Sequence, residues 1–314
     1  MSQISSTSPS EFAIRVPASI ANLGPGFDTL AVAVTLYLRL TAKIQSGHNE
    51  LHFHFVNCKL DGENYIERAF RFLAAQRGAS FPSLSVEVSS DIPAKAGLGS
   101  SAAATVAGLR LYEAIAGPLS PQGLLNAASA LEQHPDNVAA ALLGGLTVSC
   151  QLPDRSVVAV RLPWPARLGF VVLTPALALS TSEARNVLPR QVSREDAVFN
   201  LQHLALLLQA LRIEDFALLR QALHDRLHQP FRRDLVPGLE SALALEHPDL
   251  LGVCLSGAGP SLVALAAENF EAIEQLLADT FKSTGVPFRI RRLQVHNERE
   301  ESLANSAHDF MRVR

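Results

Sequence analysis

One segment of the chain combines glycines, serines and the start of a helix in a way that suits phosphate binding. Residues 97–101 read GLGSS, and residues 102–115 continue as a strongly helical run. The glycines let the backbone approach an anion closely, and a helix N-terminus offers free N–H groups and the positive end of a dipole. The Gly-Lys-Ser/Thr sequence of a Walker loop is missing. A plain helix N-cap formed by Ser is the alternative interpretation.

A second group of polar residues follows the next predicted helix, at residues 121–132. Residues 132–137 read EQHPDN. The carboxylate of Glu132 could hold Mg²⁺ opposite the hydroxyl of Ser101, because Mg²⁺ takes few protein oxygens and keeps its other positions for phosphate and water. In the simpler alternative, Asp136 caps a short helix, Glu132 is a solvated charge and His134 lies in a loop.

A polar loop near the N-terminus could recognise a small polar molecule. Residues 22–28 read NLGPGFD. Its two glycines do not form a dinucleotide-binding fingerprint, since Thr29 stands where a third glycine is required. The carboxamide of Asn22 and the carboxylate of Asp28 suit a hydroxyl and an ammonium group, although a polar turn would use the same residue types.

A further glycine-rich segment lies between two apolar strands in the second half of the chain. Residues 256–261 read SGAGPS. Residues without bulky side chains let another group approach the backbone closely. A glycine-rich hairpin is the alternative interpretation.

Two segments contain arginines that could bind a carboxylate. Residues 181–185 read TSEAR, and residues 229–232 read QPFR. A guanidinium group matches a carboxylate with two parallel hydrogen bonds. Taken singly, either arginine could equally be an ordinary surface residue, so both interpretations stay open at this point.

The apolar periodicity predicts an α+β protein with two domains, because strands and helices alternate without a regular βαβ repeat. In the first half, strands are expected at residues 12–16, 30–40, 51–56, 84–88, 146–150 and 157–162. In the second half, strands are expected at residues 168–173, 252–255, 261–266 and 288–295. We place the boundary at the Pro-Trp-Pro sequence of residues 163–165. The predicted division is a disordered leader at 1–11, domains at 12–163 and 164–297, and a polar tail at 298–314.

Composition and charge exclude several classes of protein. Of the 314 residues 48% are hydrophobic and 18% charged, a balance typical of globular domains, and the net charge of −3 favours neither nucleic acid nor an anionic membrane as a partner. Cys58, Cys150 and Cys254 lack the spacing of a disulfide framework or zinc site. We see no secretory signal and no apolar run near the roughly 18 residues of a membrane span. A cytoplasmic protein is therefore expected.

Together, the order and spacing of these motifs resemble the GHMP kinases over nearly the whole chain, residues 12–295. The three motifs of that family correspond to residues 16–28, 93–103 and 256–261, and the second of them reads PAKAGLGSSAA. The resemblance implies an ATP-binding N-terminal domain like ribosomal protein S5 domain 2 and a ferredoxin-like C-terminal domain. It also implies Mg²⁺ as a cofactor and an active site between the two domains.

Within this family the chain is most similar to the homoserine kinases, which convert L-homoserine to O-phospho-L-homoserine in threonine biosynthesis. The resemblance assigns the acceptor substrate to Asn22, Asp28, Asp136, Asn137, Thr181, Arg185, Arg232 and Gly259. It assigns the ATP phosphates to Pro93, Lys95, Gly97, Leu98, Gly99, Ser100, Ser101, Ala102 and Ala103. It implies that Ser101 and Glu132 bind Mg²⁺ and that Asn137 acts in catalysis by orienting the acceptor hydroxyl.

Two positions depart from the homoserine kinase pattern, because Gln133 and Ala31 stand where glycine is usual. Two other functions are weighed against this prediction. One is a GHMP-type kinase that acts on a mevalonate-like or sugar alcohol, and the other is a nucleotide-binding regulator without catalysis. The expected partner is the small-molecule substrate, with no nucleic acid and no membrane, and a homodimer is left open.

Overall fold

The first of two sheets is organised around one long strand in the computed structural model, which describes residues 11–59 and 62–298. Its strands are β1 (Glu11–Ala21), β2 (Leu30–His48), β3 (Leu51–Phe55), β4 (Pro82–Ser90), β5 (Leu146–Gln151) and β6 (Val157–Leu162). The order is β3-β4-β2-β5-β6, and β1 pairs with β2. The first residues of β2 pair with β5 and the later ones with β4, so this strand connects the two sides of the sheet.

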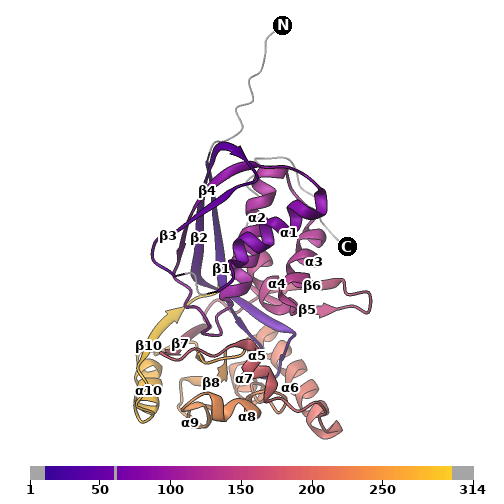
Figure 1. Ribbon diagram of the computed structural model, residues 1–314. Coiled ribbons are helices and arrows are strands. Elements are labelled where there is room, and N and C mark those ends of the chain that lie inside the picture. The colour runs from indigo at the N-terminus through magenta and orange to yellow at the C-terminus, as the bar shows by residue number, and fades with distance from the viewer. Residues whose placement is uncertain (1–10, 60–61, 299–314) are drawn as a thin grey trace.

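Four helices pack beside this sheet (Figure 1). They are α1 (Tyr65–Arg77), α2 (Ser100–Ala116), α3 (Pro121–Glu132) and α4 (Pro135–Leu143). The side chain of Asn64 caps α1, and that of Ser120 caps α3. α2 is buried along most of its length, and at Gly108 a side chain would collide with the carbonyl oxygen of Ile66, since an added Cβ would lie 2.1 Å from it. The small residues of α2 therefore let it lie close to α1.

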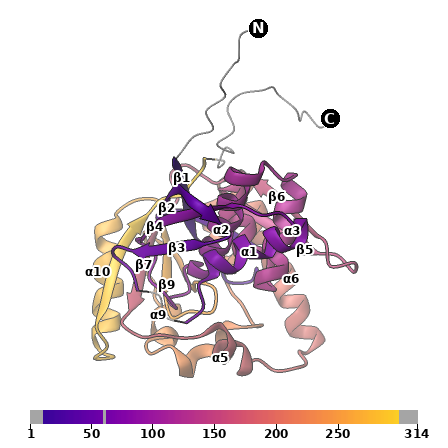
Figure 2. The ribbon, with the colours of Figure 1, turned by 45° about the horizontal axis from the view of Figure 1, so that its top comes forward.

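The second sheet is antiparallel, with the order β10-β7-β9-β8. Its strands are β7 (Gly169–Pro175), β8 (Leu250–Leu255), β9 (Leu262–Ala266) and β10 (Phe288–Leu293). The helices of this half are α5 (Thr181–Asn186), α6 (Arg194–Ile213), α7 (Phe216–Ala222), α8 (Gln229–Arg232), α9 (Leu239–Leu243) and α10 (Phe270–Lys282). A 3₁₀ turn at Arg233–Leu235 follows α8. Figure 2 shows α10 at one end of this half and α6 at the other.

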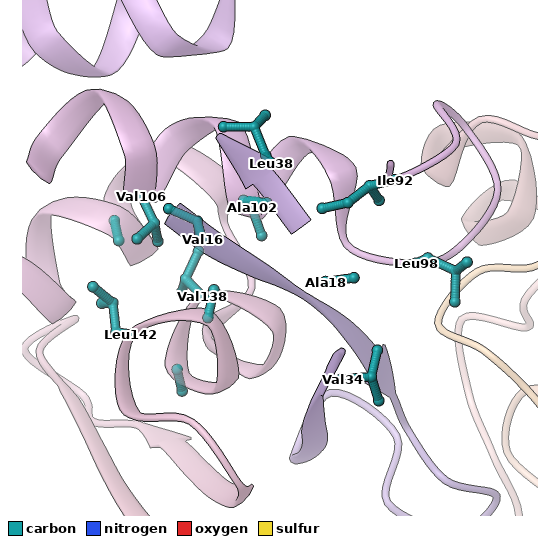
Figure 3. Close-up of a cluster of buried hydrophobic side chains, with 14 of the residues drawn as sticks. Val16, Ala18, Val34, Leu38, Ile92, Leu98, Ala102, Val106, Val138 and Leu142 are labelled. Atoms are coloured by element: carbon teal, nitrogen blue, oxygen red, sulfur yellow. The ribbon is translucent and has the colours of Figure 1, made fainter. Parts of the chain in front are cut away.

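The largest cluster of buried apolar side chains is continuous across both halves of the molecule. It extends from Val16 on β1 to Phe170 on β7 and Leu207 on α6. Figure 3 shows part of it, where Val16 on β1 faces Val106 on α2 and Val138 on α4. Because the same core supports β1 and the N-terminal ends of α2 and α4, the loops at those ends are held in fixed relation to one another.

Two sheets with packed helices confirm the predicted α+β class. β1 and β2 extend beyond their predicted ends, to Ala21 and His48, and α5 and α8 were not predicted because such short helices have too few turns to show a periodic pattern. Apart from Glu11, which begins β1, and Glu298, which pairs with Arg15, the predicted leader and tail lie outside the described residues. No helix in the described ranges is long and apolar enough to cross a membrane.

Candidate active site

The predicted phosphate loop connects β4 to α2 and ends at an uncapped helix N-terminus. Gly97 and Gly99 have φ values of 78° and 69°, in the left-handed region that favours glycine. Gly99 is the N-cap of α2 and supplies no side-chain hydrogen bond, so no side chain at this position competes with an anion for the first N–H groups of the helix.

Both glycines are also required by close packing. A Cβ on Gly97 would lie 2.3 Å from the carbonyl oxygen of Ser256, and a Cβ on Gly99 would lie 2.1 Å from Oγ of Ser19. The hydroxyl of Ser256 donates a hydrogen bond of 2.6 Å to the carbonyl oxygen of Gly97. The loop is thus clamped between β1 and the second glycine-rich segment, residues 256–261, and its N–H groups have a fixed direction.

The two predicted metal ligands lie in direct contact beside this loop. Ser101 Oγ donates a hydrogen bond of 2.8 Å to Glu132 Oε1, and Thr105 Oγ1 donates another of 2.7 Å to the same oxygen. Arg68 Nη2 lies 3.6 Å from this oxygen and also donates to the carbonyl oxygen of Leu131. Among residues 11–59 and 62–298 no cluster of three or more His, Cys, Asp or Glu could hold a metal. The oxygen donors of this hydroxyl–carboxylate pair fit Mg²⁺, which would take its remaining ligands from phosphate and water.

The turn that presents Glu132 uses an unusual backbone conformation. Gln133, the C-cap of α3, has a φ of 67°, which is the left-handed conformation that a glycine at this position would adopt without steric cost. His134 then acts as the N-cap of α4, so Asp136 lies in the first turn of the helix and is buried. The simpler interpretation of Asp136 as the helix cap is therefore wrong.

Asp136 and Asn137 lie between the phosphate loop and the polar loop at residues 22–28. Asp136 Oδ1 accepts hydrogen bonds from the backbone and side-chain nitrogens of Asn137, at 2.7 and 3.1 Å. Asn137 Oδ1 accepts one of 2.6 Å from Ser19 Oγ, and the side-chain oxygen lies 3.1 Å from the position that a Cβ on Gly99 would occupy. Burial, reinforced by the nearby Asp28 carboxylate, raises the pKa of Asp136 to about 6.

The polar loop keeps its shape through Asn22 and turns Asp28 towards the second half of the chain. Asn22 Oδ1 accepts from the backbone nitrogen of Asp28 at 3.0 Å, and Asn22 Nδ2 donates to the carbonyl oxygen of Gly257 at 2.9 Å. The oxygen and the nitrogen of this carboxamide therefore each form a hydrogen bond within the protein. The carboxylate of Asp28 instead accepts a hydrogen bond of 2.6 Å from Arg185 Nη2 and lies 4.0 Å from His134 Nδ1.

The two predicted carboxylate-binding arginines converge on one aromatic ring. The guanidinium carbons of Arg185 and Arg232 lie 5.4 and 5.5 Å from the ring centroid of Phe27. Arg232 is only 1% exposed and donates to the carbonyl oxygens of Ala184 and Gly257. Burial lowers the pKa of Arg232 to about 10, so the guanidinium stays charged at neutral pH. Two cations are therefore present beside the Asp28 carboxylate.

Three other predicted residues lie on the segments that form this centre. Thr181 is exposed at the first position of α5, one turn before Arg185. Gly259 donates its N–H to the carbonyl oxygen of Ser256, and Lys95 is exposed, with its own carbonyl oxygen bonded to the N–H of Leu179. Motif reading alone did not identify Ser19, Phe27, Arg68 or Thr105 as contributors. Their signal is weak because one serine or arginine has no distinctive spacing.

The family comparisons agree with this geometry. The family of GHMP kinases N terminal domains matches residues 64–145, and that of GHMP kinases C terminal domains matches residues 207–282. Homoserine kinase of Deinococcus radiodurans is 41% identical over 285 residues, which cover 89% of this chain and 92% of that protein. Homoserine kinase of Saccharomyces cerevisiae is 36% identical, and the match covers 88% of this chain and 94% of that protein.

A solved structure supports the same assignment. The crystal structure of homoserine kinase from Cytophaga hutchinsonii superposes with a TM-score of 0.81 at 26% identity, over 91% of this chain and 95% of that one. The predicted fold is therefore confirmed, with the two GHMP kinase domains in the predicted order. Because relatives above 30% identity match over nearly their full length, the chain belongs to the GHMP kinase family, within its homoserine kinase branch.

Proposed function

We propose that this protein is a cytoplasmic homoserine kinase, which transfers the γ-phosphoryl group of ATP to the side-chain hydroxyl of L-homoserine and so serves threonine biosynthesis. The observation that carries the proposal is the convergence of two kinds of group on one loop. The uncapped N-terminus of α2 and the Ser101–Glu132 pair suit a metal-bound triphosphate. Carboxylates and arginines, which suit an α-amino acid, lie beside the same loop.

On the nucleotide side, the chain supplies positioning and electrostatic stabilisation. The N–H groups at the start of α2 would hold phosphate oxygens, and the clamped glycines would keep those groups in place. Ser101 and Glu132 would hold Mg²⁺, whose chemistry when bound is to neutralise charge on the phosphates. Residues 93–103 are the proposed triphosphate-binding segment.

On the acceptor side, opposite charges are placed to match an amino acid. Arg185 and Arg232 would bind its carboxylate, and Asp28 and Asp136 would bind its ammonium group. Asn137 would orient the hydroxyl, because its Nδ2 carries a second hydrogen besides the one donated to Asp136. The hydroxyl oxygen then bonds to the γ-phosphorus as the bond to ADP breaks, and its proton leaves late or passes to the transferred phosphoryl group.

A coupled assay of ADP release tests the proposed function. Purified protein with ATP and Mg²⁺ is expected to turn over with L-homoserine and to show at most trace activity with mevalonate or a panel of sugars. Turnover of mevalonate or a sugar in preference to homoserine would instead identify another GHMP-type kinase. ATP binding without ADP release on any alcohol would identify a regulator.

The raised pKa of Asp136 predicts an acidic limit to activity. We expect kcat/KM for homoserine to fall as the pH drops through about 6, since protonation removes the negative charge that would bind the substrate ammonium group. Below that pH the decline should approach about tenfold per pH unit. pH–rate profiles of the wild type and of Asp136→Asn provide the measurement, and the variant should have a low kcat/KM without this acidic limb.

His134 provides the control, because it is a second titratable group beside the same carboxylates. Burial, and then the charge of Arg185, lower the pKa of His134 below its ordinary value. His134→Gln should therefore keep the acidic limb. Loss of the limb in His134→Gln and its retention in Asp136→Asn would assign the titration to the histidine instead.

A further inference from the structure

A buried histidine contacts Arg232 from one turn earlier in the chain. His228 is the N-cap of α8 and has 0% exposure. Its Nδ1 lies 3.1 Å from Arg232 Nη1, and its Nε2 lies 2.9 Å from the carbonyl oxygen of Gly24 in the polar loop. Its ring stacks on Phe27 at a centroid distance of 5.1 Å and an interplanar angle of 19°. One imidazole thus connects an arginine of the proposed acceptor site with the loop opposite.

The two hydrogen bonds determine the tautomer of this imidazole. A guanidinium group only donates hydrogen bonds, so Nδ1 of His228 must accept. A carbonyl oxygen only accepts, so Nε2 must carry the hydrogen. The ring is therefore neutral, which agrees with the lowering of its pKa by burial. A protonated Nδ1 would turn an N–H towards the N–H of Arg232 and break the contact.

Asp225, the nearest carboxylate, has a separate structural role. Its Oδ2 lies 3.6 Å from Nε2 of His228, but this oxygen already accepts from the backbone nitrogens of His228 and Gln229. Its other oxygen accepts from Asn200 Nδ2, which also donates to the carbonyl oxygen of Pro25. Asp225 therefore anchors the chain before α8 to α6 and to the polar loop, and Nε2 of His228 keeps its bond to Gly24.

The hydrogen bonds of the buried Arg232 side chain involve Nε and Nη1 of its guanidinium group. The single hydrogen on Nε bonds to the carbonyl oxygen of Ala184 at 3.1 Å. The two hydrogens on Nη1 bond to Nδ1 of His228 and to the carbonyl oxygen of Gly257. Within the described residues, Nη2 makes no hydrogen bond. The acceptors on Nε and Nη1 therefore determine the direction in which Nη2 points.

We propose that His228 is a positioning residue for substrate binding: its Nδ1 accepts from Arg232 Nη1 and so directs Arg232 Nη2 at the carboxylate of the amino-acid substrate. This inference rests on the proposed function. His228 itself does not touch the substrate. The histidine is used because a neutral imidazole places an acceptor and a donor on opposite edges of one rigid ring, so that the arginine and the polar loop are aligned together.

Two amide substitutions distinguish the role of Nδ1 from the role of Nε2 in His228. His228→Asn keeps an acceptor near the Nδ1 position but does not reach Gly24, whereas His228→Gln keeps a donor near the Nε2 position and removes the acceptor for Arg232. We expect His228→Gln to raise KM for homoserine about tenfold or more, with KM for ATP unchanged. His228→Asn should change KM for homoserine about threefold or less.

If His228 acts through Arg232, the effects of His228→Gln and Arg232→Lys on KM for homoserine should not add. A merely structural role of His228 would not produce this result. In an Arg232→Lys background the positioning role is already lost, so adding His228→Gln should raise KM for homoserine less than twofold further. Thermal unfolding of each variant checks that it is folded. Equal effects of His228→Asn and His228→Gln, a full additional effect in the double variant, or failure of both single variants to fold would each overturn the inference. An inactive wild type would overturn the proposed function itself, whereas an active wild type without this pattern overturns only the role of His228.

Discussion

Glu132→Gln is expected to lower kcat by about a hundredfold or more while the protein remains folded. Glutamine keeps an oxygen that can accept from Ser101 and Thr105, so the local hydrogen bonds can persist. The substitution removes the negative charge that would hold Mg²⁺ next to the phosphates. The apparent Mg²⁺ concentration for half-maximal activity should rise as well. Steady-state kinetics across a Mg²⁺ titration at saturating ATP and homoserine provide the measurement.

Glu67→Gln is the matched control for this variant. Glu67 lies on α1 and pairs with Arg71, apart from the phosphate loop. Its loss should leave kcat and the Mg²⁺ titration unchanged, because an exposed ion pair within one helix contributes little. If Glu132→Gln behaved like this control, Glu132 would not be a metal ligand.

Arg185→Met is expected to raise KM for homoserine about a hundredfold, with a much smaller change in KM for ATP. Two charge-assisted hydrogen bonds to a carboxylate, at about 1.5 kcal/mol each, correspond to roughly 3 kcal/mol, or about two powers of ten in affinity. Arg185 is better suited to this test than Arg232, since its side chain is 30% exposed and its removal disturbs the core less. Initial rates over a homoserine concentration series measure the effect.

A substrate analogue distinguishes loss of the carboxylate contact from a general loss of structure. The amino alcohol 2-aminobutane-1,4-diol keeps the ammonium group and the acceptor hydroxyl of homoserine but lacks the carboxylate. The wild type should strongly prefer homoserine over this analogue, and Arg185→Met should lose most of the preference. Arg226→Gln, which removes an arginine paired with Glu195 and Asp196, should keep it. A preference that is the same in all three proteins would contradict the assignment of Arg185.

Local sequence predicted most of the elements and the motifs that they carry. The apolar runs indicated nearly every strand and the long helices, because burial of one face imposes a period of two or of 3.6 residues on the chain. The GLGSS segment before the apolar helix predicted an anion site. This prediction is also local, because the glycines and the start of the helix are consecutive in the chain. The α+β class and the family followed from the order of these motifs.

Only the tertiary structure decided which polar groups meet and what state they are in. Arg185 and Asp28 are 157 residues apart in sequence and form an ion pair, which no local pattern can reveal. Asn22 was predicted to face the substrate from its motif alone, and only the tertiary structure adds that its carboxamide also bonds to Asp28 and to Gly257. The pKa of Asp136 and the tautomer of His228 depend on burial and on neighbours from several elements. These properties arise from desolvation and from long-range contacts, so they exist only once the core has brought the loops together.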